Sequence, residues 1–482
     1  MELDYQKLGL KAGLEIHQQL DTGKLFCNCP GYLRNDEPDF IVHRKLHKVA
    51  GESGEIDVAV EHEAVLDREF VYQGYKDTTC LVELDEEPPY LMNEKALKEA
   101  LKIALLLNCE IYSVSQIMRK TVIDGSNTSG FQRTVLIAHD GFLETSFGKV
   151  GIETIALEED AARIISKKDN EAVYRLDRLG IPLVEIATKP DMHMPEQIKE
   201  TALKLGEILR ACKVKRGIGT IRQDVNVSIK GHDRVEIKGF QEPRIMIKTV
   251  DLEIERQIQE LEQKKRKSEV RNALADGTTA FLRPMPGEAR MYPETDLSLL
   301  KIGREKINQL KKQLPKLKTE IRDELKKKGL SDEMINLVLE GNLDEFEVLL
   351  GVYNKDANLV AKMVTLWRNE LATKYNKDLD EIREILNERI LEKILEEVRN
   401  GKINERDAKK IMTDVAEGKK VEEAIKVEKI SDDELEGEIR KIVKEKPGLR
   451  PNAYMGLVMA KLKGKLDANK AMEILIKIVE GK

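Results

Sequence analysis

The first part of the chain, up to about residue 300, repeats short segments in which polar and apolar residues alternate. Alternation with a period of two predicts β-strands that bury one face and expose the other. Because such strands usually pair in antiparallel or mixed sheets, we expect a sheet with one apolar face and one polar, functional face. The segments are 10–20, 54–65, 150–157, 181–187, 224–230 and 234–240.

Two longer segments of this region repeat their apolar residues at helical spacing instead. One covers 93–108, where Asn93 is a suitable N-cap, and the other covers 195–212, where Pro195 stands in the first turn. From about residue 304 onward, nearly every segment has the pattern of a charged amphipathic helix. The sequence therefore predicts an α+β region followed by an all-α region.

Breaks in this pattern mark the domain boundaries that we expect. The Pro- and Gly-rich segment 284–296 ends the mixed region, which places one boundary near residue 303. A compact final helical unit begins near residue 427. Because a chain of 482 residues is too long for a single hydrophobic core, we predict domains at 1–303, 304–426 and 427–482.

Composition narrows the class of protein. Charged residues make up 35% of the chain and hydrophobic residues 41%, which predicts an ion-pair-rich surface. No apolar run has the length of a signal peptide core at the start or of a membrane span elsewhere, so we expect a cytoplasmic protein. With a net charge of −6, nucleic acid would be bound by local basic patches. Five cysteines do not make a disulfide scaffold in so long a chain.

Carboxylates interrupt several predicted strands at positions where an apolar residue would serve the core. In segment 10–20, Glu15 and His17 are two positions apart and therefore share a face. A buried carboxylate is stable only when it is paired or bound to a cation. If the acids of different segments converge they would form a Mg²⁺ site; if they do not, each is an ordinary salt-bridged residue. The further acids are Glu158, Glu159, Asp160, Glu185, Asp224 and Glu236.

No standard nucleotide-binding motif is present, so a nucleotide would be held by carboxylate-bound Mg²⁺ and by basic side chains. Segment 119–134 adds a Gly-, Ser- and Asn-containing loop whose backbone N–H groups could hold an anion. Cys27, Cys29 and Cys80 either contribute to a structural zinc site or remain free thiols. The basic candidates near the acidic segments are Arg119, Lys120, Arg133, Arg178, Arg222 and Lys238.

Several motifs, in order along residues 8–298, resemble those of the GatB/GatE family of tRNA-dependent amidotransferase subunits. They are GLEIHQQLDTGKLFC, RKTVIDGSNTSGFQRT, LEEDAAR, YRLDRLGIPLVEIATKPD, GTIRQDVNVSIKG and RPMPGEARMYPETD. The stretches IHQQL, SNTSGFQRT and LDRLGIPL look like the archaeal GatE branch. Residues 452–477 are similar to the YqeY-like tail domain of the family.

The resemblance implies a fold and a reaction. The fold is an N-terminal glutamine synthetase/guanido kinase-like domain, called a cradle, followed by all-α helical and tail domains. The reaction is that of a ligase in protein biosynthesis, which uses ATP and Mg²⁺ to phosphorylate the side-chain carboxylate of glutamate mischarged on tRNA(Gln). Ammonia from a partner subunit, in archaea the asparaginase-like GatD, then yields Gln-tRNA(Gln). The assembly expected is a heterotetramer with two copies of each subunit.

The resemblance also implies residue roles. The metal ligands would be Glu15, His17, Glu159 and Glu185, all four of them catalytic. Lys120 matches a lysine near the ammonia route. The resemblance does not decide whether Zn²⁺ is bound. Glu83 stands where the family often has its last cysteine, after Cys27, Cys29 and Cys80. The supporting groups or second-metal ligands would be Glu158, Asp160 and Asp224. The contacts to ATP would be Arg119, Arg178, Arg222, Asp224 and Lys238. The contacts to tRNA would be Lys461, Lys463 and Lys465.

The chain departs from the GatE pattern in one respect. That branch usually carries an inserted domain, similar to one in bacterial aspartyl-tRNA synthetases, where this chain has only residues 259–270. We therefore expect a changed affinity for tRNA and unchanged catalytic residues. Two other functions are considered: a non-catalytic tRNA-binding adaptor, which the retained carboxylates disfavour, and a ligase for a free amino acid, which the long helical region disfavours.

Overall fold

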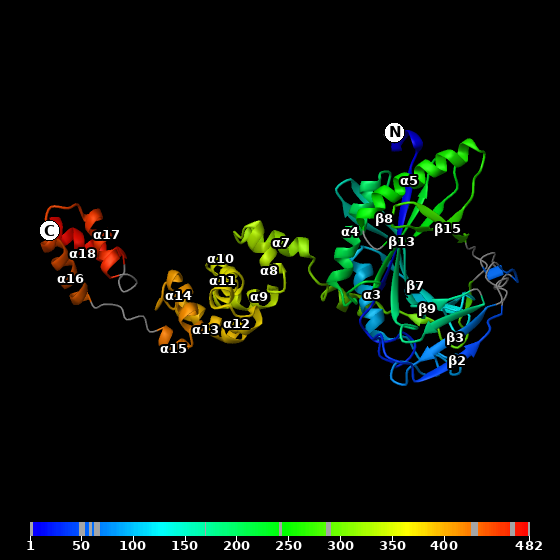
Figure 1. The fold of residues 1–482 in the computed structure, drawn as a ribbon, viewed down its shortest axis with the longest axis horizontal. Helices are drawn as coiled ribbons and strands as arrows, with labels where there is room; N and C mark the ends of the chain where they lie inside the picture. Colours follow the sequence, from blue (N-terminus) through cyan, green and yellow to red (C-terminus); the bar gives the residue numbers. More distant parts are fainter. Residues whose placement is uncertain are drawn as a thin grey trace. The chain divides into compact units, whose positions relative to one another are not determined.

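The computed structural model describes residues 3–47, 54–56, 60–61, 68–168, 170–240, 243–285, 291–425, 432–462 and 468–480. The chain divides into two compact units, Met1–Leu317 and Lys318–Lys482 (Figure 1). The first unit combines a large sheet with helices and the second is helical throughout its described residues, which confirms the predicted α+β and all-α regions. Most of segment 54–65, predicted as a strand, lies outside the described residues.

A large sheet forms the centre of the first unit. Its described strands are β1 (Lys11–Gln19), β4 (Glu110–Ile111), β6 (Met118–Thr121), β7 (Phe131–Thr145), β8 (Gly148–Glu159), β11 (Pro182–Thr188), β12 (Ile221–Ser228), β13 (Val235–Phe240), β14 (Glu269–Ala273), β15 (Thr279–Pro284) and β16 (Met291–Pro293). Their order is β15-β14-β13-β12-β1-β11-β8-β7-β6-β16, and β4 pairs with β7. Described neighbours are antiparallel except β13 and β14, so the predicted antiparallel or mixed sheet is confirmed.

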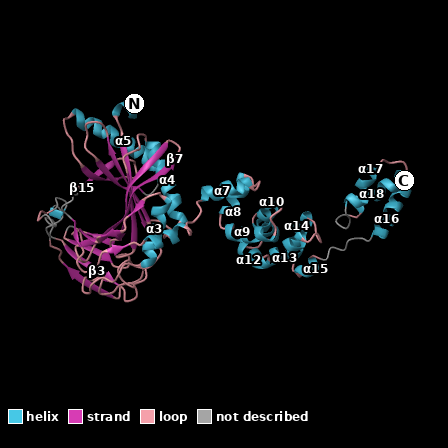
Figure 2. Ribbon diagram, turned by 180° about the vertical axis from the view of Figure 1, so that it is seen from behind, coloured by secondary structure: helices cyan, strands magenta, loops and turns pink. Residues whose placement is uncertain are grey.

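Helices cover the apolar face of this sheet (Figure 2). They are α3 (Glu94–Leu106), α4 (Pro195–Ala211) and α5 (Pro243–Glu262). On β1 the alternation works as predicted: Leu14 and Ile16 are buried in the core, whereas Glu15 and His17 face the other side and line a cavity. The Asn93 side chain caps α3 by accepting hydrogen bonds from two backbone N–H groups of its first turn. The predicted helices α3 and α4, together with α5, therefore pack on the apolar face of the sheet. The polar face is not covered by these helices.

A smaller sheet has the order β2 (Phe40–Arg44), β3 (Glu69–Gly74), β10 (Glu171–Arg175) and β9 (Arg163–Lys167). Its aromatic core includes Phe70, Tyr72 and Tyr174. Lys167, the last residue of β9, lines the same cavity as Glu15 and His17 of the large sheet. The two sheets therefore supply different walls of one cavity. The other elements given for the described residues of the first unit are α1 (Tyr5–Leu8), β5 (Val114–Ser115), β17 (Leu300–Lys301) and α6 (Arg304–Lys311).

The second unit contains two separate hydrophobic clusters. One is built from α7 to α15 and the other from α16 to α18. In the first unit, α6 buries Leu310 in the core that also contains α3, although the predicted boundary near 303 precedes it. The division into 1–303, 304–426 and 427–482 stays a prediction. The helices are α7 (Lys318–Lys327), α8 (Asp332–Leu339), α9 (Leu343–Val352), α10 (Ala357–Val364), α11 (Leu366–Tyr375), α12 (Leu379–Ile385), α13 (Glu388–Arg399), α14 (Glu405–Ala416), α15 (Val421–Ala424), α16 (Asp432–Glu445), α17 (Pro451–Lys461) and α18 (Ala468–Glu480).

Among the described residues, no helix is both long enough and apolar enough to cross a lipid bilayer.

Candidate active site

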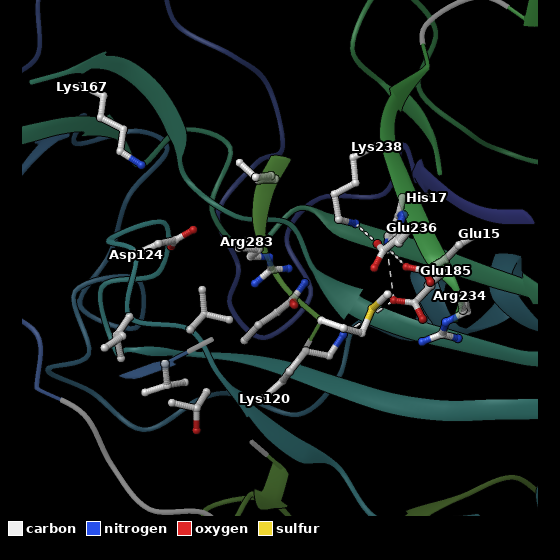
Figure 3. Close-up of a pocket in the computed structure, with 17 residues that line it drawn as sticks. Glu15, His17, Lys120, Asp124, Lys167, Glu185, Arg234, Glu236, Lys238 and Arg283 are labelled. Atoms are coloured by element: carbon white, nitrogen blue, oxygen red, sulfur yellow. Dashed lines mark hydrogen bonds and ion pairs between the residues drawn. The ribbon is translucent and has the colours of Figure 1, made fainter. Parts of the chain in front are cut away.

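A cavity of about 520 Å³ lies on the polar face of the large sheet. In Figure 3, Glu15, His17, Glu185, Glu236 and Lys238 gather on one side of it, and Asp124 and Lys167 lie on the opposite side. Both signs of charge therefore face the same space. The charged and imidazole side chains that line the cavity are Glu15, His17, Lys120, Asp124, Lys167, Glu185, Arg234, Glu236, Lys238 and Arg283.

The register of the strands explains why these side chains meet. His17 on β1 lies directly opposite Glu185 on β11, and Glu15 lies opposite Asp224 on β12. Residues directly opposite each other in paired strands project from the same face of the sheet. Glu185 in turn lies opposite Ala156 on β8, so Glu158, two residues further along β8, projects from that face as well. Strand pairing thus collects four acids from segments that are distant in sequence.

The cluster is close enough to share protons or a cation. His17 Nε2 lies 3.2 Å from Glu185 Oε2 and 3.5 Å from Glu15 Oε1. Lys120 Nζ lies 2.6 Å from Glu158 Oε1 and 3.7 Å from Glu185 Oε2. Two sets of ligand atoms lie within 4.8 Å of one another: one from His17, Glu158 and Glu185, the other from Glu15, His17 and Asp224. The geometry therefore suits one or two hard divalent cations with water completing the coordination.

The protonation states follow from burial and from the neighbouring charges. Burial, together with the charge of Glu185, raises the pKa of Glu15 from 4.5 to about 7. Burial alone would lower the pKa of His17, but its hydrogen bond to Glu185 and the charge of that group raise it above 6.5. Burial would raise the pKa of Glu185, but Lys120 and the hydrogen bond from His17 hold it well below its usual range. Near neutral pH, Glu15 and His17 therefore retain protons that a cation would displace.

A second cavity, of about 490 Å³, shares His17 and Lys238 with the first. Arg178, Arg222 and Asp224 also line it, so with Lys238 four of the predicted nucleotide contacts lie here. Asp224 is 2.6 Å from Lys238 Nζ. Burial alone would lower the pKa of Lys238, but Asp224 and Glu236 raise it, so the ammonium between the two cavities stays charged. Two cavities that meet at His17 and Lys238 give room for two substrates side by side.

Arg222 and Arg178 are held in place at the second cavity by Asp160. Arg222 Nη2 lies 2.9 Å from Asp160 Oδ1, and Arg178 Nε lies 3.8 Å from Asp160 Oδ2. Gln19 Nε2 donates a 2.6 Å hydrogen bond to the same carboxylate, which is fully buried. Asp160 is therefore a positioning group for the two arginines and not a member of the acid cluster.

Glu159 and Arg119, a predicted metal ligand and a predicted ATP contact, do not lie at the first cavity. Arg119 stands next in sequence to the cavity residue Lys120, and Glu159 stands next to Glu158, whose carboxylate contacts Lys120. Neighbours along a strand project from opposite faces. Glu159 Oε2 is 3.3 Å from Arg133 Nη1. Arg119 Nη2 lies 2.6 Å from Glu294 Oε1. Glu158, and not Glu159, therefore lies in the cluster with His17 and Glu185, while the metal-ligand role that the resemblance implies for Glu159 stays a prediction.

Some residues of the site were missed by the sequence analysis or were given a lesser role. Glu158, predicted only as a supporting group or second-metal ligand, could have been preferred to Glu159 by counting in twos along β8, once its pairing with β11 is known. Glu236 was noted only as an acid in a strand, although it faces the cavity beside Lys238. Lys167 and Arg283 carried no signal, because β9 and β15, which contain them, were not among the predicted strands.

The cysteine cluster forms a second group of potential ligands. The ligand atoms of Cys27, Cys29, Cys80 and Glu83 lie within 4.8 Å of one another. Cys27 Sγ donates a 2.8 Å hydrogen bond to Glu83 Oε1, and the Cys80 backbone N–H donates one of 2.7 Å to Glu83 Oε2. Buried Lys24 lies 3.1 Å from Glu83 Oε1. Three sulfur atoms and one carboxylate at such distances fit the donor set of zinc.

Of the three lysines predicted to contact tRNA, Lys461 lies on α17, with Nζ 3.2 Å from Glu438 Oε2. Lys463 and Lys465 lie outside the described residues.

The fold and the site together define the class of protein. It has an α+β domain, followed in the chain by an all-helical unit, and the cavity of the α+β domain offers side chains that can bind a cation and side chains that can bind phosphate. The chain belongs to the GatB/GatE family. The family model described as the GatB/GatE catalytic domain matches residues 10–308. A second model, described as a GatB domain, matches residues 344–479.

Relatives agree with this assignment. The E-type subunit of glutamyl-tRNA(Gln) amidotransferase from Methanocaldococcus jannaschii is 37% identical over 630 residues, covering 99% of both chains. The protein of the same name from Methanococcus maripaludis strain C7 is 33% identical and covers 97% of both. That of Pyrobaculum aerophilum is 51% identical over 286 residues, 58% of this chain and 47% of its own. Because 630 aligned positions exceed the 482 residues here, the first relative has a long segment without counterpart, as expected for a missing insert.

Proposed function

We propose that this chain is the subunit of a tRNA-dependent amidotransferase that converts Glu-tRNA(Gln) to Gln-tRNA(Gln), as the names of its relatives indicate for those proteins. It phosphorylates the side-chain carboxylate of the esterified glutamate with ATP and then replaces the phosphate with ammonia. The observation that carries the proposal is the cluster of Glu15, His17, Lys120 and Glu185 in the wall of the first cavity, together with buried Glu158, which contacts Lys120. Its fold is the cradle that the resemblance implies.

The chemistry explains why such a cluster is needed. A carboxylate is a poor electrophile, because ammonia would have to displace an oxide ion. Transfer of the γ-phosphoryl group of ATP to a carboxylate oxygen gives ADP and an acyl phosphate. Attack of ammonia on the acyl carbon then forms the amide, releases phosphate and leaves one proton for a nearby base.

The acids of the first cavity would hold the Mg²⁺ that accompanies ATP. We assign Glu15, His17, Glu158 and Glu185 as its ligands, with Asp224 at a second position. When bound, the cation would spread the negative charge that develops on the phosphoryl oxygens. Lys120 lies within 2.6 Å of Glu158, so it stays next to the ligands and can contact a phosphoryl oxygen.

The other cations of the first cavity bind the remaining charge of ATP. Lys167, Arg234, Lys238 and Arg283 line the space without being ligands of the cation site. Arg178 and Arg222 line the second cavity, where they can bind the negatively charged end of the second substrate. His17 and Lys238 stand between the two cavities, which is where the γ-phosphate and the glutamate carboxylate have to meet.

The void beside Glu159 supports an ammonia route. It has a volume of about 20 Å³, enough for one molecule of the size of water or ammonia, and Lys24, Arg133 and Glu159 line it. Gln132 links it to the first cavity, because its amide donates both to the Glu159 carbonyl and to the Glu158 carboxylate. Ammonia would come from a partner subunit, which the resemblance identifies as the asparaginase-like GatD in a heterotetramer.

We also propose that Cys27, Cys29, Cys80 and Glu83 hold a structural Zn²⁺. Metal analysis of purified protein should find zinc, and Cys80→Ser should remove it. Zinc retained in that variant would exclude this ligand set. The division into a catalytic domain 1–303, a helical domain 304–426 and a tail domain 427–482 belongs to the same proposal, and the cytoplasmic location stays a prediction.

The decisive experiment supplies the chain with labelled ATP, Mg²⁺ and Glu-tRNA(Gln), with and without ammonium. ADP formation that depends on the charged tRNA, followed by Gln-tRNA(Gln) when ammonium is added, supports the proposal. Turnover on free glutamate would instead identify a small-molecule ligase. Binding of tRNA without any ATP turnover would identify a non-catalytic adaptor.

A further inference from the structure

We propose that the turn between α5 and β14 binds the phosphodiester backbone of the tRNA as its acceptor end enters the first cavity. The turn, named here the basic turn, consists of Lys264, Lys265, Arg266 and Lys267. All four residues are exposed. The inference rests on the proposed function for its substrate, but it concerns a surface outside the cavity.

The basic turn has a defined backbone. Lys264 has φ +59, in the left-handed region, and its N–H donates to the Leu261 carbonyl at 3.0 Å. The Lys265 N–H donates to the Glu260 carbonyl at 2.8 Å, as at the ends of many helices. Ser268 Oγ donates to the Arg234 carbonyl at 2.9 Å and fixes the other end of the turn. The four cations are therefore presented from a short, anchored loop.

Three acids flank the basic turn: Glu262, which is exposed, and Glu260 and Glu269, which already pair with other side chains. Glu260 Oε1 lies 2.7 Å from Arg256 Nη1, and Glu260 Oε2 lies 3.0 Å from His232 Nε2. Glu269 Oε1 lies 2.5 Å from Arg271 Nη1. Among the residues of the chain that the structure describes, no carboxylate lies within 4.0 Å of a side-chain nitrogen of the basic turn. Four successive cations thus remain available in a protein whose net charge is −6.

The position of the basic turn connects it to the cavity. Ser268, the residue after the basic turn, donates its hydrogen bond to the backbone carbonyl of Arg234, and the side chain of Arg234 lines the first cavity, where Figure 3 shows it. Val235 pairs with Glu269, so the strand that follows the turn lies directly beside the strand that follows Arg234. Positive charge therefore continues from the cavity rim to the basic turn. A ligand that reaches the cavity and extends outside it as a polyanion is an RNA strand.

Affinity and its salt dependence test the inference. The variant Lys265→Gln with Lys267→Gln removes two cations from the basic turn, and Lys95→Gln with Lys98→Gln removes two exposed cations from α3 as a matched control. Affinity of the full chain for Glu-tRNA(Gln) is measured over a series of salt concentrations. We expect the basic-turn variant to bind about tenfold more weakly at low salt, with the salt slope reduced by roughly 1.5 units. The control should match the parent.

Three further measurements make the result specific. The variant Lys265→Arg with Lys267→Arg keeps the charge and should retain the affinity of the parent. At saturating tRNA, the Gln variant should form ADP at the parental rate, because the basic turn does not touch the reacting groups. An unchanged thermal unfolding transition shows that the Gln variant is folded.

Parental affinity and salt slope in the Gln variant would overturn the inference. The inference would also be overturned if the Gln variant bound tRNA normally but no longer associated with the ammonia-supplying subunit. In that case the basic turn would be a protein-docking surface. Failure of the proposed function looks different. In that case the parent itself forms no tRNA-dependent ADP, whatever the basic turn does to RNA affinity.

Discussion

At the scale of single residues, the site depends on the face of the strand from which each side chain projects. Glu158 and Glu159 are neighbours in sequence, but only the Glu158 carboxylate contacts Lys120, a side chain that lines the first cavity. Glu159 lies on the other side of the sheet with Arg133. Motif matching alone cannot separate the two acids, whereas the pairing of β8 with β11 does.

This contrast gives a matched pair of variants. Glu158→Gln removes a negatively charged ligand and should lower Mn²⁺ affinity by at least about tenfold and tRNA-dependent ADP formation by about a hundredfold. Glu159→Gln should keep Mn²⁺ affinity near that of the parent, because its carboxylate lies outside the cluster. Glu15→Gln should behave like Glu158→Gln, with tRNA binding preserved in both. Mn²⁺ titration and ADP release measure these effects.

The opposite result for the pair would be informative. If Glu159→Gln lost Mn²⁺ and Glu158→Gln kept it, the ligand set that the resemblance implied would hold and the assignment of Glu158 would be wrong. Loss of tRNA binding in Glu15→Gln would point to a structural role for that acid instead.

Cation binding should also depend on pH. The pKa of Glu15 is raised to about 7 and that of His17 above 6.5, so both groups carry protons below these values. A cation needs the carboxylate and the neutral imidazole, so its binding releases protons. Mn²⁺ affinity should therefore fall by about tenfold per pH unit for each displaced proton as the pH drops below 7, and level off above it. Titration calorimetry in buffers of different ionisation enthalpy counts the protons, and a pH-independent affinity would contradict the assignment.

At the scale of elements, the sequence predicted those strands and helices that have clear periodicity. Alternation identified β1, β8, β11, β12 and β13, and the Asn93 cap and Pro195 marked the starts of α3 and α4. It did not identify β9 or β15, which contribute Lys167 and Arg283, because their exposed and half-buried residues do not alternate regularly. Register is a long-range property, so no local pattern could show that His17 faces Glu185.

In the helical unit, the buried side chain of Arg368 connects its own helix, α11, to α9 and to the end of α12. Arg368 on α11 is almost fully buried and donates two 2.6 Å hydrogen bonds to Glu345 on α9. It also donates to the carbonyl of Leu386, just after α12. An unpaired guanidinium at this position would be costly, because a buried charge without a partner loses its hydration.

Glu345→Ala should therefore destabilise this unit by about 3 kcal/mol. Glu347→Ala removes an exposed acid from the same helix and should change stability by no more than about 0.5 kcal/mol. Hydrogen exchange of the α9 and α11 amides in the full chain measures both effects. Equal exchange rates in the two variants would show that the ion pair contributes little.

At the scale of the whole molecule, catalysis is predicted to reside in the first unit, whereas tRNA affinity is predicted to be shared between the basic turn of that unit and the tail. The two cavities and the cysteine cluster lie within Met1–Leu317. The long segment that the Methanocaldococcus relative has in addition is absent here, while the residues of the first cavity are present. Without the additional segment, we expect tRNA affinity to come from the basic turn and from the predicted contacts of the tail.

Removal of residues 427–482 tests this division. The tail helices α16, α17 and α18 have their own hydrophobic cluster, which includes Leu435, Tyr454 and Leu475, so the cut leaves the cluster of α7 to α15 intact. We expect at least about tenfold weaker binding of Glu-tRNA(Gln) and a shallower salt dependence, because the phosphate contacts predicted for residues such as Lys461 would be lost. Mn²⁺ affinity should stay at the parental value, since all the assigned ligands lie in the first unit. Unchanged tRNA affinity would place RNA binding entirely in the first 426 residues, and lost Mn²⁺ binding would show that the tail supports the fold of the catalytic unit.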